Sequence, residues 1–169
     1  MRKLYAALGL VVTTAVLAMP SGLSAGLDTT FCAGWTLAGN AQCIQGRIGQ
    51  AGNMAGNTCI GFEPFGDVGS LTSGPVTAGS IVFGWSVITS DGLPYDYIFV
   101  DTIGPLGTIR VAQLGFPSYL GAGVCLGFGG VANINLGANC ASSCQVRIGV
   151  HEDGFGDTLQ GNIAGVAFI

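Results

Sequence analysis

Residues 151–161, HEDGFGDTLQG, gather the side chains of this chain that could do chemistry. The segment holds His151, the only histidine, and three of the nine acidic residues. Glu152, Asp153 and Asp157 offer the hard oxygen ligands that Ca²⁺ prefers, and the intervening glycines would let backbone carbonyls join them. The acids do not follow the EF-hand loop pattern. We therefore interpret the segment as a tight turn between strands and expect no cofactor, with calcium as the alternative.

A catalytic role for His151 lacks partners in the sequence. Histidine titrates near neutrality and could act as a general base, but no G-x-S-x-G elbow and no H-E-x-x-H motif occurs. Asp96 and Asp101 lie on one expected strand with opposite orientations, which makes them a poor pair for glycoside hydrolysis. Asp101 either lies at the solvent end of that strand or pairs with Arg110 as a buried partner. We assign no catalytic residue.

Two segments rich in aromatic and β-branched residues are typical of strands, SIVFGWSVIT at 80–89 and YDYIFVDTI at 95–103. The turn-forming sequence SDGLP between them predicts a hairpin. Its facing pairs would be Val87 with Tyr97, Trp85 with Phe99, and Phe83 with Asp101. Such an aromatic face is usually core. A binding platform for sugar rings that uses Tyr95, Tyr97 and Trp85 is the alternative, with Tyr95 reaching solvent beside the turn.

Six cysteines follow the first 25 residues, and we expect them to form three disulfides in an oxidising compartment. They are Cys32, Cys43, Cys59, Cys125, Cys140 and Cys144. An N-terminal and a C-terminal group of three are favoured, so at least one bond must cross between the groups. Zinc is the rival interpretation, because Cys140 and Cys144 have ligand spacing, but no second pair completes a tetrahedral set.

The N-terminal segment has the order of a secretory signal peptide. Arg2 and Lys3 precede an uncharged run that extends to Met19, and small residues follow Pro20. We expect residues 1–25 to be removed and residues 26–169 to form a single β-rich domain that is secreted, extracellular or in the cell envelope. No membrane span is expected after that removal, and an uncleaved anchor is the alternative.

The charge of the remaining chain excludes two classes of partner. Beyond residue 25 there are three arginines, no lysine and nine carboxylates, a net charge of −6. Nothing basic is available to meet phosphates, so nucleic acids and anionic membrane surfaces are excluded as partners. Glycine makes up 30 of 169 residues. Because glycine disfavours helix interiors and suits turns and closely packed strands, this composition favours an all-β fold.

We predict an antiparallel β-sandwich or partly open barrel of about seven or eight strands. Residues 26–60 are expected to be a glycine-rich, loop-rich region held by disulfides. Later strands are expected at about 107–114, 122–127, 131–136, 145–151 and 158–169. In 145–151, Val146, Ile148 and Val150 would point to one side, and Gln145, Arg147 and His151 to the other.

The sequence therefore predicts a non-catalytic structural or interaction module, secreted or at the cell surface, that either assembles with itself or binds another extracellular protein or glycan. Low charge and abundant glycine suit self-assembly. A monomeric domain that recognises glycan or calcium through the loops at 90–96 and 151–157 is the first alternative. A small secreted hydrolase with an unrecognised site is the second.

Overall fold

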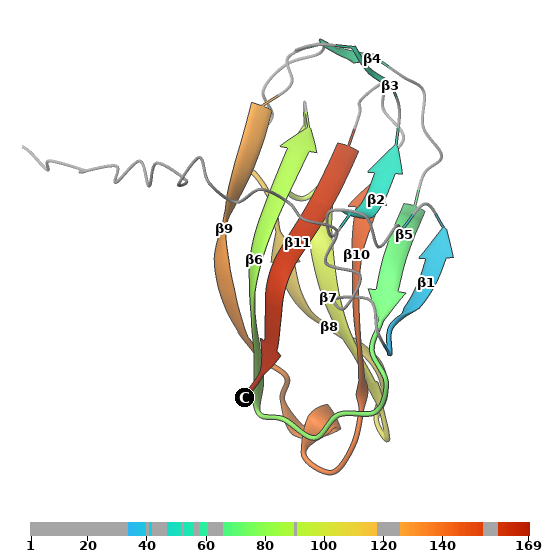
Figure 1. Ribbon diagram of the computed structural model, residues 1–169, viewed down its shortest axis with the longest axis vertical. Coiled ribbons are helices and arrows are strands. Elements are labelled where there is room, and N and C mark those ends of the chain that lie inside the picture. The colour runs from blue at the N-terminus through green and yellow to red at the C-terminus, as the bar shows by residue number, and fades with distance from the viewer. Residues whose placement is uncertain are drawn as a thin grey trace, which may run out of the picture.

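Strands make up nearly all of the regular structure (Figure 1). The computed structural model describes residues 34–39, 41, 47–51, 53–55, 58–60, 66–89, 91–117, 126–153 and 159–169, and within 47–60 only the backbone. The expected signal peptide, Cys32, Cys43, Cys125 and Asp157 lie outside the described residues, as does the Cys59 side chain. None of the described helices is long and apolar enough to cross a membrane.

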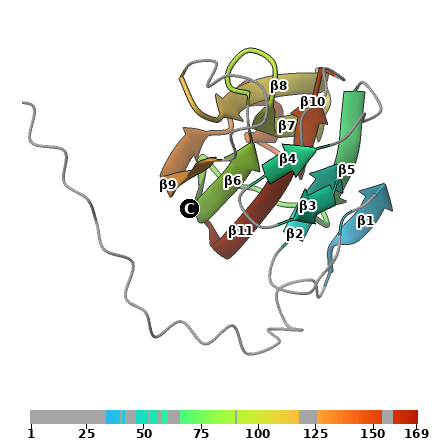
Figure 2. The ribbon, with the colours of Figure 1, turned by 90° about the horizontal axis from the view of Figure 1, so that it is seen from above.

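Two antiparallel sheets pack face to face, as predicted for a sandwich (Figure 2). The five-stranded sheet has the order β1 (Thr36–Gly39), β5 (Gly66–Thr72), β10 (Gln145–Glu152), β7 (Tyr97–Gly104) and β8 (Gly107–Leu114). The four-stranded sheet has the order β2 (Arg47–Ala51), β11 (Leu159–Phe168), β6 (Ser80–Thr89) and β9 (Leu126–Asn135). A separate short pair is formed by β3 (Asn53–Ala55) and β4 (Thr58–Ile60). The predicted all-β sandwich is confirmed.

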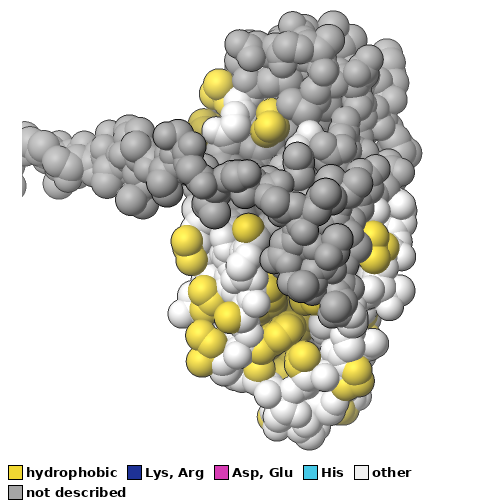
Figure 3. Space-filling view, viewed as in Figure 1, with side chains coloured by type: hydrophobic (Ala, Val, Ile, Leu, Met, Phe, Trp, Pro, Cys, Tyr) yellow, Lys and Arg dark blue, Asp and Glu magenta, His cyan; other side chains and the backbone are white. Residues whose placement is uncertain are grey.

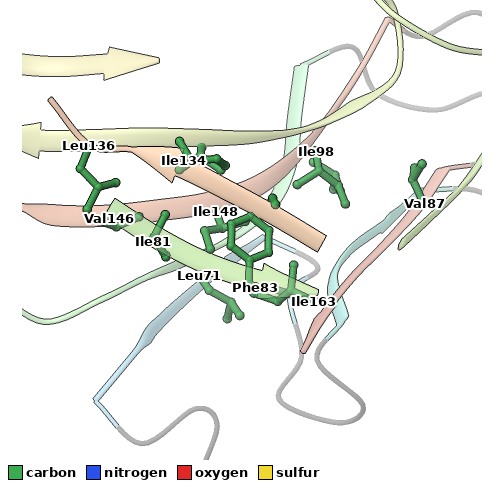
Figure 4. Packing of buried hydrophobic residues seen from close by; sticks show 14 of the residues in the cluster. Leu71, Ile81, Phe83, Val87, Ile98, Ile134, Leu136, Val146, Ile148 and Ile163 are labelled. Carbon is green, nitrogen blue, oxygen red and sulfur yellow. The ribbon is translucent and has the colours of Figure 1, made fainter. Parts of the chain in front are cut away.

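The core lies between the two sheets and follows the alternation of the strands (Figure 4). In β10, Val146, Ile148 and Val150 are fully buried, as the sequence pattern predicts, whereas Arg147 lies on the opposite side. In β6, Ile81 and Phe83 meet them from the other sheet. Burial of side chains of this size stabilises the fold by roughly 1.5–3 kcal/mol each.

The predicted hairpin of β6 with β7 is wrong. The two strands belong to different sheets, with β6 between β9 and β11 and β7 between β8 and β10. Each strand has an apolar face, and the chain buries both faces by stacking the strands across the core rather than by pairing them. The segment between them therefore crosses from one sheet to the other. Local turn chemistry does not distinguish these two arrangements.

Buried polar groups hold this crossover in place. The Thr89 hydroxyl donates a 2.5 Å hydrogen bond to Asp96 Oδ2 and accepts one of 3.0 Å from the Asp91 backbone N–H. The backbone N–H of Leu93 donates to the carbonyl of Phe116, just beyond β8. The crossover is thus tied to the ends of strands in both sheets.

A second correction concerns β9, which is one strand where the sequence predicts two, at 122–127 and 131–136. The gap between the two expected strands contains Gly129 and Gly130, but the strand runs through them. At Gly129 a Cβ atom would collide with the backbone carbonyl oxygen of Trp85. Glycine here permits close approach of two strands instead of ending one of them.

Candidate functional site

Except for Glu152, the charged side chains of the five-stranded sheet gather on its outer face, the side turned away from the core. We call them the ion-pair cluster: Asp67, Asp101, Arg110, Arg147 and His151. The strand register explains the gathering, because Arg147 lies opposite Asp101 and His151 lies opposite both Asp67 and Tyr97. Residues opposite one another in antiparallel strands point to the same face. Four strands, β5, β7, β8 and β10, contribute to the cluster.

Asp101 is the centre of the cluster. Its side chain is 2% exposed, and its Oδ1 accepts a 2.8 Å hydrogen bond from Arg110 Nε. Its Oδ2 accepts bonds of 3.1 Å from Arg147 Nε and 2.5 Å from Arg147 Nη2. Of the two placements that the sequence left open for Asp101, the structure has the partnership with Arg110, and it adds Arg147.

These contacts shift the pKa of both partners. Burial by itself would raise the pKa of Asp101, but the hydrogen bonds and positive charges of Arg110 and Arg147 outweigh it, so the pKa lies below its ordinary value. Burial by itself would lower the pKa of Arg110, but the hydrogen bond to Asp101 and its negative charge outweigh this effect, so the pKa lies above its ordinary value. The pair is therefore ionised throughout the pH range in which proteins usually function.

An aromatic ring lies directly beneath the arginines. The Arg110 guanidinium carbon is 4.1 Å from the centre of the Phe99 ring, and that of Arg147 is 5.2 Å away, which is within the range of cation–π contacts. The ring also packs over Gly149, where a Cβ atom would come within 2.5 Å of Phe99 Cζ. Phe99 is fully buried in this way although it lies on the outer face.

The histidine completes the cluster without forming a catalytic triad among the described contacts. His151 Nδ1 lies 2.9 Å from Asp67 Oδ1, and its ring stacks on Tyr97 with centroids 4.9 Å apart. Arg110 Nη1 donates a 3.2 Å bond to the Tyr97 hydroxyl. Because these charged groups bond one another across four strands, their arrangement favours a role in holding the sheet together.

The predicted calcium residues are only partly described. Glu152 is the last residue of β10, and it is fully buried on the same side of the strand as Val150. The expectation that the carboxylates lie in solvent on a turn is therefore wrong for Glu152. Asp153 follows the strand and is partly exposed. Among the described residues no group of three or more His, Cys, Asp or Glu side chains could hold a metal ion, and with Asp157 outside them the calcium alternative stays a prediction.

The predicted aromatic platform does not form as one surface. Tyr95 is exposed at 46%, as expected, but Tyr97 is on the outer face of the five-stranded sheet and Trp85 lies on the inner side of the other sheet. Trp85 instead meets Phe128 at 5.6 Å, and Phe128 meets Phe116 at 5.5 Å, both edge to face. We call these three residues the aromatic chain. Sequence reasoning missed it because its members lie on separate strands and loops.

The outer face formed by β6, β9 and β11 has the opposite character among the described side chains, and we call it the uncharged face. Its outward positions in β6, β9 and β11 are Ser80, Val82, Gly84, Ser86, Ile88, Gly127, Gly129, Val131, Asn133, Asn135, Gln160, Asn162 and Ala164. In Figure 3 this side shows apolar and neutral polar side chains, with no charged side chain among those described. Val131 is 79% exposed on it.

A disulfide joins Cys140 to Cys144, with Cα atoms 4.8 Å apart. The bond lies at the start of β10, beside the short 3₁₀ helix at Ala138–Cys140. It confirms a pairing within the expected C-terminal group. The zinc interpretation is wrong for these two sulfurs, because they are bonded to each other.

Comparison of the sequence with protein-family models gives no match, and comparison with curated proteins gives none. Among solved structures, the chain is similar to the enzymatically active domain of bacteriophage CBA120 tailspike protein 4, at 11% identity and a TM-score of 0.33 over 82% of this chain. This chain spans only 20% of the tailspike chain.

Two carbohydrate binding modules also resemble it. One, of family 35 from an environmental isolate, has 12% identity and a TM-score of 0.30, covering 79% of this chain and 97% of the module. The other, from Cellvibrio mixtus lichenase 5A in complex with cellotriose, has 16% identity and a TM-score of 0.30, covering 71% and 87%. At these TM-scores the similarity defines neither a family nor a ligand.

Proposed function

We propose that this chain is an exported, non-catalytic interaction module that binds its partner through the four-stranded sheet, at or outside the cell surface. The uncharged face carries this proposal. It presents the exposed Val131 together with small and amide side chains. Surfaces of this kind, when contiguous, mark sites of protein interaction.

The distribution of charge supports the choice of this face. Burying the outer face of the five-stranded sheet would remove water from the partly exposed arginines and Asp67, whose side chains are 30–36% exposed. Desolvating charged groups costs several kcal/mol per ion unless they are well paired. The described side chains of the uncharged face carry no such cost. For a chain of net charge −6 beyond residue 25, it is the surface that a partner covers with the least electrostatic penalty.

Export is supported by the N-terminal sequence and by the sulfur chemistry. The order of charged, apolar and small residues at 1–25 is that of a signal peptide. The Cys140–Cys144 bond agrees with this, because disulfides persist in oxidising compartments outside the cytoplasm. Sequencing the N-terminus of the exported protein tests the cleavage expected near residue 25.

A charge placed on the uncharged face tests the interaction. Ser86→Lys puts a lysine at the middle of that face, and Thr108→Lys is the matched control on the outer face of the five-stranded sheet. The readout is the fraction of exported protein that remains with the cell envelope or in assemblies larger than a monomer. We expect Ser86→Lys to lower this fraction severalfold and Thr108→Lys to leave it unchanged. Equal behaviour of the two variants would overturn the proposal.

Glycan binding is the second candidate, and the aromatic chain favours it. Phe128 is 40% exposed, and Leu126 beside it is 44% exposed. Ring edges and faces of this kind suit the apolar side of a neutral sugar.

Titration with a neutral oligosaccharide such as cellotriose, followed by tryptophan fluorescence, tests this candidate. We expect a saturable change in the wild type that Phe128→Ala removes and Leu37→Ala, an exposed position on β1, preserves. No change up to about 10 mM sugar, which corresponds to a binding free energy weaker than about −2.7 kcal/mol, would exclude the candidate.

A further inference from the structure

The four edge strands of the sandwich differ in how well they are protected against pairing. An edge strand exposes a row of free N–H and C=O groups, and monomeric proteins block such rows with short strands, charges or bulges. β1 has only 4 residues. β8 carries Arg110, and its register with β7 is irregular. β2 has 5 residues, and its register with β11 is also irregular.

β9 has none of these protections. It is 10 residues long, LGFGGVANIN, without a charge or a proline. It pairs with β6 in unbroken register from Ser80–Asn135 to Thr89–Leu126. In the described part of the chain, no strand pairs with its other side. A long and uncharged edge is a template for the addition of another strand.

We infer that β9 pairs antiparallel with β9 of a second copy of this chain, joining two four-stranded sheets into one continuous sheet. This inference rests on the proposed function and adds a second copy of the chain as the partner at the edge beside the uncharged face. The contact is isologous, with a two-fold axis perpendicular to the sheet.

The strand is complementary to itself about Val131. Opposite residues of an antiparallel pair point to the same face, so the axis must pass through a residue and not between two. With the axis at Val131, outward Gly129 meets outward Asn133 of the copy, and inward Gly130 meets inward Ala132. At the axis the two Val131 side chains form a β-branched pair. Small residues flank Val131 on both sides in β9, so the backbones of the two β9 strands can approach each other.

The absence of charged residues from β9 allows a second copy to approach at this edge. Two chains of net charge −6 repel each other over most of their surfaces, and their repulsion is weakest where the strand and the neighbouring face carry no charge. Inward Phe128 would lie opposite Ile134 of the copy, so its exposed edge would be covered. An extended peptide from another protein is the competing occupant of the same edge.

Sedimentation velocity of the exported chain over a range of concentrations tests the inference. We expect a monomer–dimer equilibrium in the wild type. Val131→Lys places two lysines against each other at the axis and should weaken the dimer about 100-fold, because like charges that face each other across an interface cost several kcal/mol. Leu106→Lys adds the same charge at a position 65% exposed in the β7–β8 turn and should change nothing.

A second variant reports the geometry directly. Val131→Cys should form a disulfide between copies, detected as a 131–131 crosslinked peptide by mass spectrometry. If Val131→Lys does not fold, as judged by its thermal unfolding, Asn133→Lys, also outward and exposed on β9, replaces it.

The outcomes separate this inference from the proposed function. A chain that stays monomeric, or a dimer that Val131→Lys leaves intact, overturns the pairing of β9 with its copy. If Ser86→Lys still abolishes envelope retention in that case, the interaction module stands with a different partner. If Ser86→Lys has no effect either, both are overturned.

Discussion

Replacing Asp101 by asparagine should destabilise the fold by about 2–3 kcal/mol at pH 7. Asparagine keeps the size of the side chain but removes its charge and turns one acceptor oxygen into a donor facing two guanidinium groups. Asp101 accepts bonds from both Arg110 and Arg147. Each charge-assisted bond contributes roughly 1.5–3 kcal/mol. The arginine side chains remain 30% and 31% exposed, so water replaces part of the loss.

The effect should depend on pH with a definite sign. The pKa of Asp101 is lowered in the folded state from the ordinary 3.8. A depressed pKa means that the carboxylate's contribution is complete above 3.8 and is lost as the pH falls through the folded-state value. The stability gap between the wild type and Asp101→Asn should therefore be constant near neutrality and should narrow at pH values below 3.8.

Urea unfolding at pH 7 and at successively lower pH measures the gap, given equal m values for the two proteins. Asp67→Asn is the matched control, because Asp67 contacts the same two arginines but its side chain is 36% exposed. We expect the control to cost less than about 1 kcal/mol. A loss for Asp101→Asn no larger than that for Asp67→Asn, or a gap that does not narrow in acid, would contradict a stabilising role for the Asp101 carboxylate.

Three further results are expected. Replacing both Cys140 and Cys144 by alanine should lower the free energy of unfolding, measured in urea, by about 2 kcal/mol, the chain-entropy value for so short a loop. Peptide mapping without reduction should find Cys125 joined to one of the three N-terminal cysteines, and a free Cys125 would contradict this. Gly149→Ala should cost about 2–3 kcal/mol because its Cβ would lie 2.5 Å from a backbone oxygen, while Gly84→Ala, with 3.5 Å of space, should cost little. The calcium alternative predicts that added Ca²⁺ raises the Tm, and an unchanged Tm contradicts it.

The strands of this protein are largely readable from its sequence. The segments at 80–89 and 107–114 coincide with β6 and β8. The alternation of Val146, Ile148 and Val150 gives the buried side of β10. These features are local, because the side chains of a strand alternate whatever its neighbours are. The exception is β9, where glycines that look like breaks allow close packing.

Only part of the ion-pair cluster can be predicted from the sequence. Arg110 and Asp101 could be suspected as partners, since each interrupts an apolar strand. Arg147 could not be added, because its position beside Asp101 depends on the pairing of β10 with β7 across more than forty residues. The aromatic chain was hidden for the same reason, as Phe116 and Phe128 meet only through the stacking of two sheets.

Sequence alone determined that this chain is a β protein with few charges, because composition and alternation act through neighbouring residues. The tertiary structure decided which strands pair, and with that which charges meet and which edge is left open. The physical reason for this pairing is hydrophobic burial, because the apolar faces of strands in the two sheets are buried against each other. β6 and β7 therefore lie in different sheets, although the turn-forming sequence between them is compatible with a hairpin.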